Sequence, residues 1–226
     1  MGIKYHLMSQ LIFKFPFKTK YYEQDYYVSS NNFSAYKLIE GWPNWPEKWV
    51  NIFGPSGCGK THLANILKKK IKSVEILDAK EINDQIASKF DNLDCLIIEN
   101  YKNNIRENFF YSILNQSKQL NNYIVINSNF PIKDIQFETK DLKSRAESFL
   151  NLGIDLPTDD LLRVIISKSF SDKQIDVEPK ISEYIIKNID RSYEKVFKFI
   201  KDIDNLSLSS GKSININLIK KVLGNE

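Results

Sequence analysis

The stretch WVNIFGPSGCGKTHLANIL, residues 49–67, decides the fold. It begins with an apolar run of strand character and ends with apolar residues at helical spacing, and a glycine-rich loop joins the two. The loop, GPSGCGKT at 54–61, matches G-x-x-x-x-G-K-[ST] in the strand-to-helix context that this motif requires. Backbone N–H groups of such a loop turn inward on phosphate, and the following helix adds its positive N-terminal end. The chain is therefore predicted to bind a nucleotide.

The loop supplies most of the predicted nucleotide contacts. Lys60 is expected to reach the β- and γ-phosphates, and the Thr61 hydroxyl is expected to ligate Mg²⁺. Cys58 is interpreted as a small residue that fills a loop position, rather than as a reactive thiol near a helix N-terminus. The predicted contact residues of the loop are Gly54, Pro55, Ser56, Gly57, Cys58, Gly59, Lys60 and Thr61.

Strand-like and helix-like segments alternate around this loop. The predicted strands are 49–53, 74–78, 95–100, 123–129 and 152–157. Strands that alternate with helices of this length indicate a parallel sheet covered on both faces. After Pro157 the strands stop, and four amphipathic segments predict a helical bundle. We therefore expect an α/β fold, in which a parallel five-stranded sheet is sandwiched by helices and followed by a small all-α domain. The expected division is a tail at 1–25, a nucleotide-binding domain at 26–156 and a helical domain at 157–226.

The strand CLIIEN, residues 95–100, ends in two polar residues that belong to the same site. Glu99 is expected to hold Mg²⁺, through water. Asn100 stands where a catalytic base is expected, and an amide can orient a water but cannot accept its proton. The sequence therefore predicts nucleotide binding with weak or no intrinsic hydrolysis. The remaining alternative is a base elsewhere, for which Asp94 and Glu107 are near in sequence.

Asn129 and two arginines complete the candidate site. Asn129 follows the next strand and could sense the γ-phosphate, although a simple turn before Pro131 explains the residue as well. Four of the 32 basic residues are arginine, and two of these four, Arg145 and Arg191, begin or lie within expected helices on the far side of the chain from the loop. An arginine that reaches phosphate contributes on the order of 10³–10⁵ in rate, whereas a surface ion pair is the commoner role.

The bulk composition is that of a globular protein. Apolar residues make up 42% and charged residues 27% of the chain, and the net charge of +4 is weak for nucleic-acid binding. No apolar run approaches the ~18 residues of a membrane helix, and no signal peptide is visible. Two cysteines without metal-ligand spacing favour a reducing cytoplasm.

Together these motifs resemble the AAA+ ATPases related to the bacterial replication initiator DnaA. The stretches that carry the resemblance are GPSGCGKTHL, NSNFP as a first sensor, DLKSR as an arginine-finger helix, and DRSYEKVFKFIKDID as the second-sensor helix of a lid. The likeness is closer to the Hda subfamily of regulatory DnaA inactivators, in its alphaproteobacterial form, over roughly residues 10–223. QLIFKFP, IEGWPNWP and PTDDLLRVIISKSFSDKQI support this subfamily. The absence of a helix-turn-helix domain after the lid is also what we expect of Hda rather than of an initiator.

The resemblance implies a regulatory function at the start of chromosomal replication. An Hda-like chain holds ADP or ATP and offers Arg145, as an arginine finger in trans, to the ATP of a neighbouring DnaA subunit. Hydrolysis of that ATP restrains initiation. By the same resemblance, Arg191 would contact the chain's own nucleotide, Tyr27 and Val28 would line the adenine pocket, and His62 would belong to the phosphate loop.

The resemblance also implies a second partner. Residues 10–15, QLIFKF, are similar to the peptide that binds the sliding clamp, the β subunit of DNA polymerase III. The predicted clamp contacts are Gln10, Leu11, Phe13 and Phe15, and DNA would be reached only indirectly. The alternative is an edge strand of the domain.

Two other functions fit the same motifs. One is a self-hydrolysing AAA+ ATPase of the DnaC helicase-loader type, and the other is a DnaA-like, nucleotide-dependent DNA replication factor. AAA+ sites often form between subunits, so a nucleotide-dependent homodimer is compatible with each of them.

Overall fold

The computed structural model describes residues 22–83, 86, 90–173, 175, 177–211 and 214–224. The predicted clamp peptide at 10–15 lies outside the described residues. The described chain divides into two compact units, with the boundary between Thr158 and Asp159. Each unit has its own core, so each is described separately.

The first unit is built on a parallel sheet, as the alternating sequence pattern predicts. Its strands are β1 (Trp49–Phe53), β2 (Val74–Asp78), β3 (Cys95–Tyr101), β4 (Tyr123–Ser128) and β5 (Leu150–Gly153). The strand order is β2-β3-β4-β1-β5, and every neighbouring pair is parallel. This order places the carboxyl ends of β1, β4 and β3 side by side at one edge of the sheet. The polar residues that end these strands therefore meet there.

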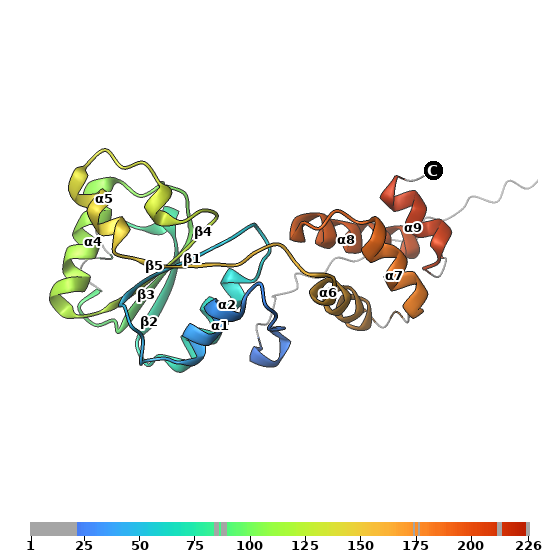
Figure 1. Ribbon diagram of the computed structural model, residues 1–226, viewed down its shortest axis with the longest axis horizontal. Helices are drawn as coiled ribbons and strands as arrows, with labels where there is room; N and C mark the ends of the chain where they lie inside the picture. Colours follow the sequence, from blue (N-terminus) through green and yellow to red (C-terminus); the bar gives the residue numbers. More distant parts are fainter. Residues whose placement is uncertain are drawn as a thin grey trace, which may run out of the picture. The chain divides into compact units, whose positions relative to one another are not determined.

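Helices cover both faces of this sheet (Figure 1). Helices α1 (Phe33–Glu40) and α2 (Lys60–Lys70) lie on one face, and α4 (Glu107–Leu120) and α5 (Lys140–Glu147) lie on the other. The second face packs a continuous apolar core in which Leu96, Ile98, Phe110 and Leu114 are fully buried. The expected α/β sandwich is confirmed.

Two segments differ in detail from the sequence prediction. Residues 79–90 have the spacing of one amphipathic helix, but the segment begins as the 3-10 turn η2 (Ala79–Glu81) with extended backbone at Ile82. Of the later residues that the structure describes, Ile86 and Phe90 are helical. Asp78 and Glu81 form a capping box that satisfies the backbone N–H groups locally, so no α-helix is needed at this point. The last strand begins at Leu150 rather than at 152, because β5 pairs with β1 from Val50 onward.

The second unit is all-helical. Its helices are α6 (Asp159–Ser171), α7 (Pro179–Asn188), α8 (Tyr193–Ser210) and α9 (Ile216–Leu223). They bury Leu162, Ile166, Ile185 and Ile200 in a common core. The predicted all-α domain is thus confirmed. Within the described ranges, no helix is both long enough and apolar enough to cross a membrane.

Candidate nucleotide-binding site

The loop between β1 and α2 has the backbone conformation of a phosphate cradle. Gly54, Gly57 and Gly59 have backbone φ angles of 156°, 83° and 100°, which residues other than glycine rarely adopt. At Gly54 the space is closed as well, because an added Cβ would lie 2.4 Å from the Ile154 carbonyl oxygen. The sequence pattern is therefore matched by a loop that requires its glycines.

Lys60 lies under this loop. Its ammonium donates hydrogen bonds to the carbonyl oxygens of Gly54 (2.7 Å) and Pro55 (3.0 Å). Lys60 is also the first residue of α2, so its charge lies where the positive end of the helix dipole is directed. This charge and the α2 N-terminus form one electropositive site beside the loop.

A carboxylate at the end of β3 contacts this site. Glu99 Oε2 accepts a hydrogen bond from the Thr61 hydroxyl (3.0 Å), and Oε1 accepts one from Asn127 Nδ2 (2.8 Å). The glutamate side chain thus reaches Thr61 directly. Burial raises the pKa of Glu99 above its usual range, while the bonds from Asn127 and Thr61 and the charge of Lys60 oppose that rise.

Buried polar residues of β1 and β4 support the strand ends beside Glu99. Asn51 Nδ2 donates to the Ile126 carbonyl (2.9 Å) and to Ser128 Oγ (2.8 Å), and its Oδ1 accepts from Ile132 N (2.8 Å). This arrangement fixes β4 and the turn that follows it. Asn129, the predicted sensor, is exposed just beyond β4, so its role remains a prediction.

Asn100 occupies a special backbone position next to Glu99. Its φ of 57° is left-handed, a conformation that asparagine tolerates better than most residues. Its Nδ2 donates to Asp78 Oδ2 (2.7 Å) at the end of β2. The Lys80 N–H and then the Asn100 amide lower the pKa of Asp78. A carboxylate therefore adjoins the position where the sequence shows only an amide.

Aromatic residues from the N-terminal segment cover the loop. The Tyr26 ring stacks on Tyr36 at 5.8 Å, meets His62 edge-on at 5.2 Å, and would lie 2.9 Å from a Cβ added to Gly59. His62 Nε2 is 2.7 Å from the Tyr22 carbonyl oxygen. His62 thus contacts the segment that covers α2.

The two residues predicted to line the adenine pocket directly follow Tyr26 in the chain. Tyr27 is exposed and Val28 is half-buried, while the Tyr27 carbonyl accepts a hydrogen bond from Asn32 Nδ2 (2.9 Å). The structure brings this segment to the phosphate loop through Tyr26. The contact of Tyr27 and Val28 with adenine remains a prediction.

The loop cysteine is an inert packing residue. Cys58 is buried, and burial raises the pKa of its thiol despite the neighbouring Lys60 charge. A raised pKa leaves little thiolate at neutral pH, and the thiolate is the reactive form. This agrees with Cys58 as a space-filling residue.

Arg145 lies far along α5 and packs on α4. Its guanidinium carbon is 4.5 Å from the centroid of the Tyr111 ring, and its Nη2 donates to Asn115 Oδ1. Among the residues that the structure describes, no carboxylate pairs with Arg145. Arg163 and Arg191, by contrast, each form ion pairs with acids.

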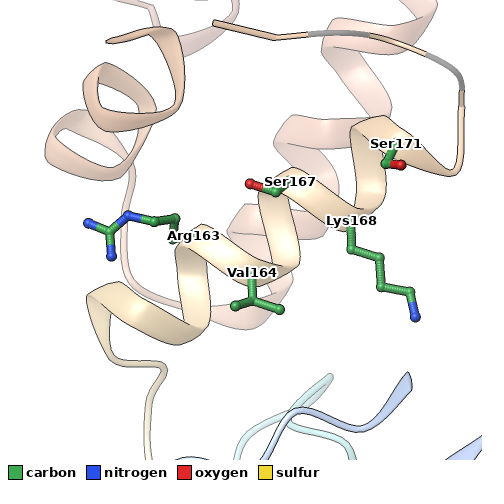
Figure 2. A pocket seen from close by; sticks show the side chains of 5 residues that line it. All are labelled: Arg163, Val164, Ser167, Lys168 and Ser171. Atoms are coloured by element: carbon green, nitrogen blue, oxygen red, sulfur yellow. The ribbon is translucent and has the colours of Figure 1, made fainter. Parts of the chain in front are cut away.

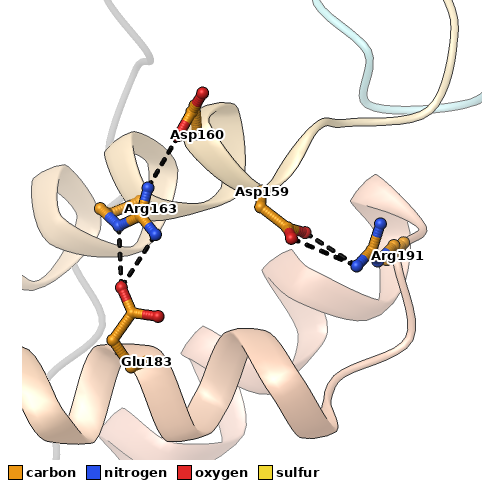
Figure 3. A network of polar contacts seen from close by, with 5 residues as sticks. All are labelled: Asp159, Asp160, Arg163, Glu183 and Arg191. Carbon is orange, nitrogen blue, oxygen red and sulfur yellow. Dashed lines mark hydrogen bonds and ion pairs between the residues drawn. The ribbon is translucent and has the colours of Figure 1, made fainter.

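Arg191 belongs to the helical unit, where it precedes α8. It pairs with Asp159 at the start of α6, with 3.0 Å between Arg191 Nη2 and Asp159 Oδ1 (Figure 3). Arg163 is held separately by Asp160 and Glu183, each at 2.8 Å. Arg163 thus has two carboxylate partners and Arg191 has one. A ligand of Arg191 would compete with that one carboxylate.

Five side chains of α6 line a groove (Figure 2). Arg163, Val164, Ser167, Lys168 and Ser171 line it, all from this one helix. The acids that pair with Arg163 reduce its charge there.

Known proteins resemble the chain in both sequence and fold. Residues 50–142 match the family model described as RNA helicase. The chain is 29% identical over 246 residues to the chromosomal replication initiator protein DnaA of Buchnera aphidicola subsp. Baizongia pistaciae, a match that covers 96% of the chain and 53% of that relative. The crystal structure of domain III of Thermotoga maritima DnaA superposes with a TM-score of 0.75 at 16% identity, over 93% of this chain and 98% of that one. The chain has a DnaA-like AAA+ fold.

A second solved structure supports the same fold. AMPPCP-bound DnaA from Aquifex aeolicus has a TM-score of 0.69 at 20% identity, over 86% of this chain and 68% of that one. The DnaA-like chain spans about half the length of the curated relatives that it matches.

Three residues of this site were not predicted from the sequence: Tyr26, Asp78 and Asn127. Asn127 is fully buried in β4, and a polar residue inside the apolar run YIVINS was the available signal. Asp78 ends β2, and its register partner Glu99 lies two residues before the end of β3. Tyr26 gave no signal of its own, because its role depends on the chain folding back onto Gly59.

Proposed function

We propose that the chain is an Hda-like regulator, which binds adenine nucleotide and promotes hydrolysis of the ATP held by a neighbouring DnaA. The observation that carries this proposal is Arg145. It is positioned on α4 without a carboxylate partner among the described residues, while the other candidate arginine, Arg191, is paired. A guanidinium has several N–H donors, and Asn115 takes one of them. The others suit the phosphate oxygens of a second subunit.

The nucleotide in the chain's own site is supported by the loop and by the comparison with AMPPCP-bound DnaA. Lys60 would bind phosphate oxygens, and Tyr26 would cover the loop. Thr61 and Glu99 offer the hydroxyl and carboxylate oxygens that Mg²⁺ prefers, and the buried carboxylate would gain from a cation. Bound Mg²⁺ would neutralise part of the negative charge of the phosphates.

Weak turnover in the chain's own site follows from Asn100. Its amide orients a water but takes no proton. The bound nucleotide would then determine the conformation of the chain, and Arg191 of the helical unit would contact this nucleotide. For Arg191 to do so, phosphate must displace Asp159, which is half-exposed and therefore a weak competitor.

Binding to the sliding clamp is the second part of the proposal. The QLIFKF peptide at 10–15 would insert Leu11, Phe13 and Phe15 into an apolar groove, while the Gln10 amide hydrogen-bonds at the edge. The clamp on DNA would thus bring the chain to DnaA without a DNA-binding surface of its own.

Measuring ATP hydrolysis by a cognate DnaA tests the proposal. The chain is added with and without DNA-loaded clamp, as wild type and as Arg145→Ala. Wild type should accelerate hydrolysis in the presence of the clamp, and Arg145→Ala should not. Failure of wild type to accelerate DnaA would sink the proposal.

One observation favours a second candidate, a DnaA-like ATPase that hydrolyses its own nucleotide. The Asp78 carboxylate lies 2.7 Å from Asn100 and could supply the missing base. In that case the chain alone should hydrolyse ATP, and Asp78→Asn should abolish this activity while Arg145→Ala retains it. No turnover by the chain alone excludes this candidate.

A further inference from the structure

Two residues of helix α4, Tyr111 and Asn115, contact the Arg145 guanidinium and are called the platform residues below. Tyr111 and Asn115 are four residues apart, so they lie on the same face of α4, one turn above the other. The guanidinium carbon of Arg145 lies 4.5 Å from the centroid of the Tyr111 ring. The side-chain oxygen Oδ1 of Asn115 accepts a hydrogen bond from Arg145 Nη2. Both platform residues are half-buried. The ring restrains the guanidinium plane, and the amide restrains its rotation within that plane.

The same helix also holds the beginning of α5. Glu107, the first residue of α4, accepts hydrogen bonds from the backbone N–H groups of Glu138 (2.7 Å) and Thr139 (3.1 Å). It accepts a third from the Thr139 hydroxyl (3.1 Å). Thr139 is the N-cap of α5, and α5 has eight residues. Helix α4 therefore fixes α5 at its start through Glu107 and near its end through Arg145.

The platform contacts leave the charge of Arg145 uncompensated. A tyrosine face attracts a guanidinium but does not neutralise it, and an asparagine carbonyl carries no net charge. A carboxylate in place of Asn115 would hold the arginine equally well, but it would compete with any anion. The residues present thus restrain the side chain while its positive charge stays available.

We propose that Tyr111 and Asn115 are positioning residues, which hold the Arg145 guanidinium in the orientation needed to meet phosphate oxygens on a second chain. This inference rests on the proposed function of Arg145 in trans. It adds that the arginine acts from a restrained position, so that loss of either contact should lower the rate without weakening association. The reason is that a misplaced catalytic group loses rate even where binding is intact.

The test measures DnaA ATP hydrolysis against DnaA concentration for a set of full-length variants. Asn115→Ala should lower the stimulated kcat about tenfold, the value of a hydrogen bond to a charged group, with an unchanged KM for DnaA. Tyr111→Leu should lower it about two- to fivefold, and Tyr111→Phe, which keeps the ring face, should match wild type. Ser112→Ala, an exposed position on the same helix, is the matched control.

A double variant separates positioning from general damage. If Asn115 acts through Arg145, then Asn115→Ala combined with Arg145→Ala should be no worse than Arg145→Ala alone. Asn115→Asp covers the case in which the alanine variant folds poorly. It keeps the size and the acceptor, and its charge should lower stimulation by competing with phosphate, at unchanged thermal stability.

Each outcome decides one claim. Full stimulation by Asn115→Ala and Tyr111→Leu, with Arg145→Ala inactive, overturns the inference and leaves the proposed function intact. Additive losses in the double variant overturn it too, because the effect then bypasses Arg145. Full stimulation by Arg145→Ala overturns the proposed function, and the inference falls with it.

Discussion

Replacing Glu99 by glutamine should make the chain more stable and at the same time less able to use Mg²⁺. Glutamine has nearly the same shape, and its carbonyl oxygen can still accept from the Thr61 hydroxyl. Its amide then faces Asn127, whose Oδ1 is buried without a hydrogen-bond partner among the described residues. A flip of the Asn127 amide would let its Oδ1 accept from the new amide, and Nδ2 would then take the unpaired position. The substitution therefore removes a buried charge while the number of unpaired Asn127 atoms stays the same.

The size of the effect follows from the pKa of Glu99. Because burial raises this pKa, the folded chain binds the carboxyl proton more tightly than the unfolded chain does. The associated stability is fully present below the unfolded value of 4.5 and is lost as pH rises through the raised folded pKa. Each unit of pKa corresponds to ~1.4 kcal/mol, and 1 kcal/mol moves the Tm of a chain of this size by about 2–4 °C. At about pH 8, Glu99→Gln should therefore raise Tm, by about 2–4 °C for each kcal/mol of charge-burial cost that it removes.

The assay is thermal unfolding of the nucleotide-free protein between about pH 4.5 and pH 8, beside titration with a fluorescent ADP analogue with and without Mg²⁺. The gain in Tm should vanish near pH 4.5, where Glu99 is also uncharged. Mg²⁺ should tighten nucleotide binding by wild type but not by the variant, because a carboxylate ligand is gone.

Glu107→Gln is the matched control with the opposite sign. The Glu138 N–H and further hydrogen bonds lower the pKa of Glu107, so its stabilisation is present above 4.5 and is lost as pH falls through the lowered pKa. Its loss should lower Tm at about pH 8. If Glu99→Gln lowered Tm at that pH, or changed it equally across the range, the reasoning about a buried, cation-seeking carboxylate would be refuted.

Further substitutions test the phosphate loop, the contact of Gly59 with Tyr26, and the clamp peptide. Lys60→Ala should weaken nucleotide binding about 10- to 100-fold, as expected for lost charge-assisted hydrogen bonds, and calorimetric titration that shows wild-type affinity would contradict this. Gly59→Ala should destabilise the fold by about 1–3 kcal/mol, because its φ is 100° and the new Cβ would lie 2.9 Å from the Tyr26 ring. Gly211→Ala, at φ 63° in open space, should cost less in the same urea titration, and equal losses would count against the contact with Tyr26. Gln10→Ala with Leu11→Ala should abolish binding to immobilised sliding clamp, and retained binding would remove the peptide from the proposal.

The sequence predicted the fold because its deciding signals are local. The phosphate loop, the strands 49–53 and 74–78 and the amphipathic helices after Pro157 each follow from neighbouring residues, and the structure contains them. The start of the segment 79–90 differs from the helix that its spacing indicates, because the capping box of Asp78 and Glu81 makes a single 3-10 turn there, while Ile86 and Phe90 are helical.

The parts of the site that escaped prediction depend on contacts between distant residues. Asn127 meets Glu99 across 28 residues, and Asp78 meets Asn100 across 22. Both pairs arise only once β2, β3 and β4 lie side by side with their carboxyl ends level. The environment of Arg145 is equally non-local, since Asn115 lies 30 residues before it.

Single-turnover hydrolysis shows whether Arg145 acts on ATP held by another chain. Labelled ATP is bound to DnaA beforehand, DNA-loaded clamp is present, and the chain is added as wild type, Arg145→Lys or Arg163→Ala. Wild type and Arg163→Ala should accelerate release of phosphate alike, whereas Arg145→Lys, which keeps the charge but loses the planar fork, should be slower by about 10³-fold or more. Equal rates for wild type and Arg145→Lys would contradict that role of Arg145.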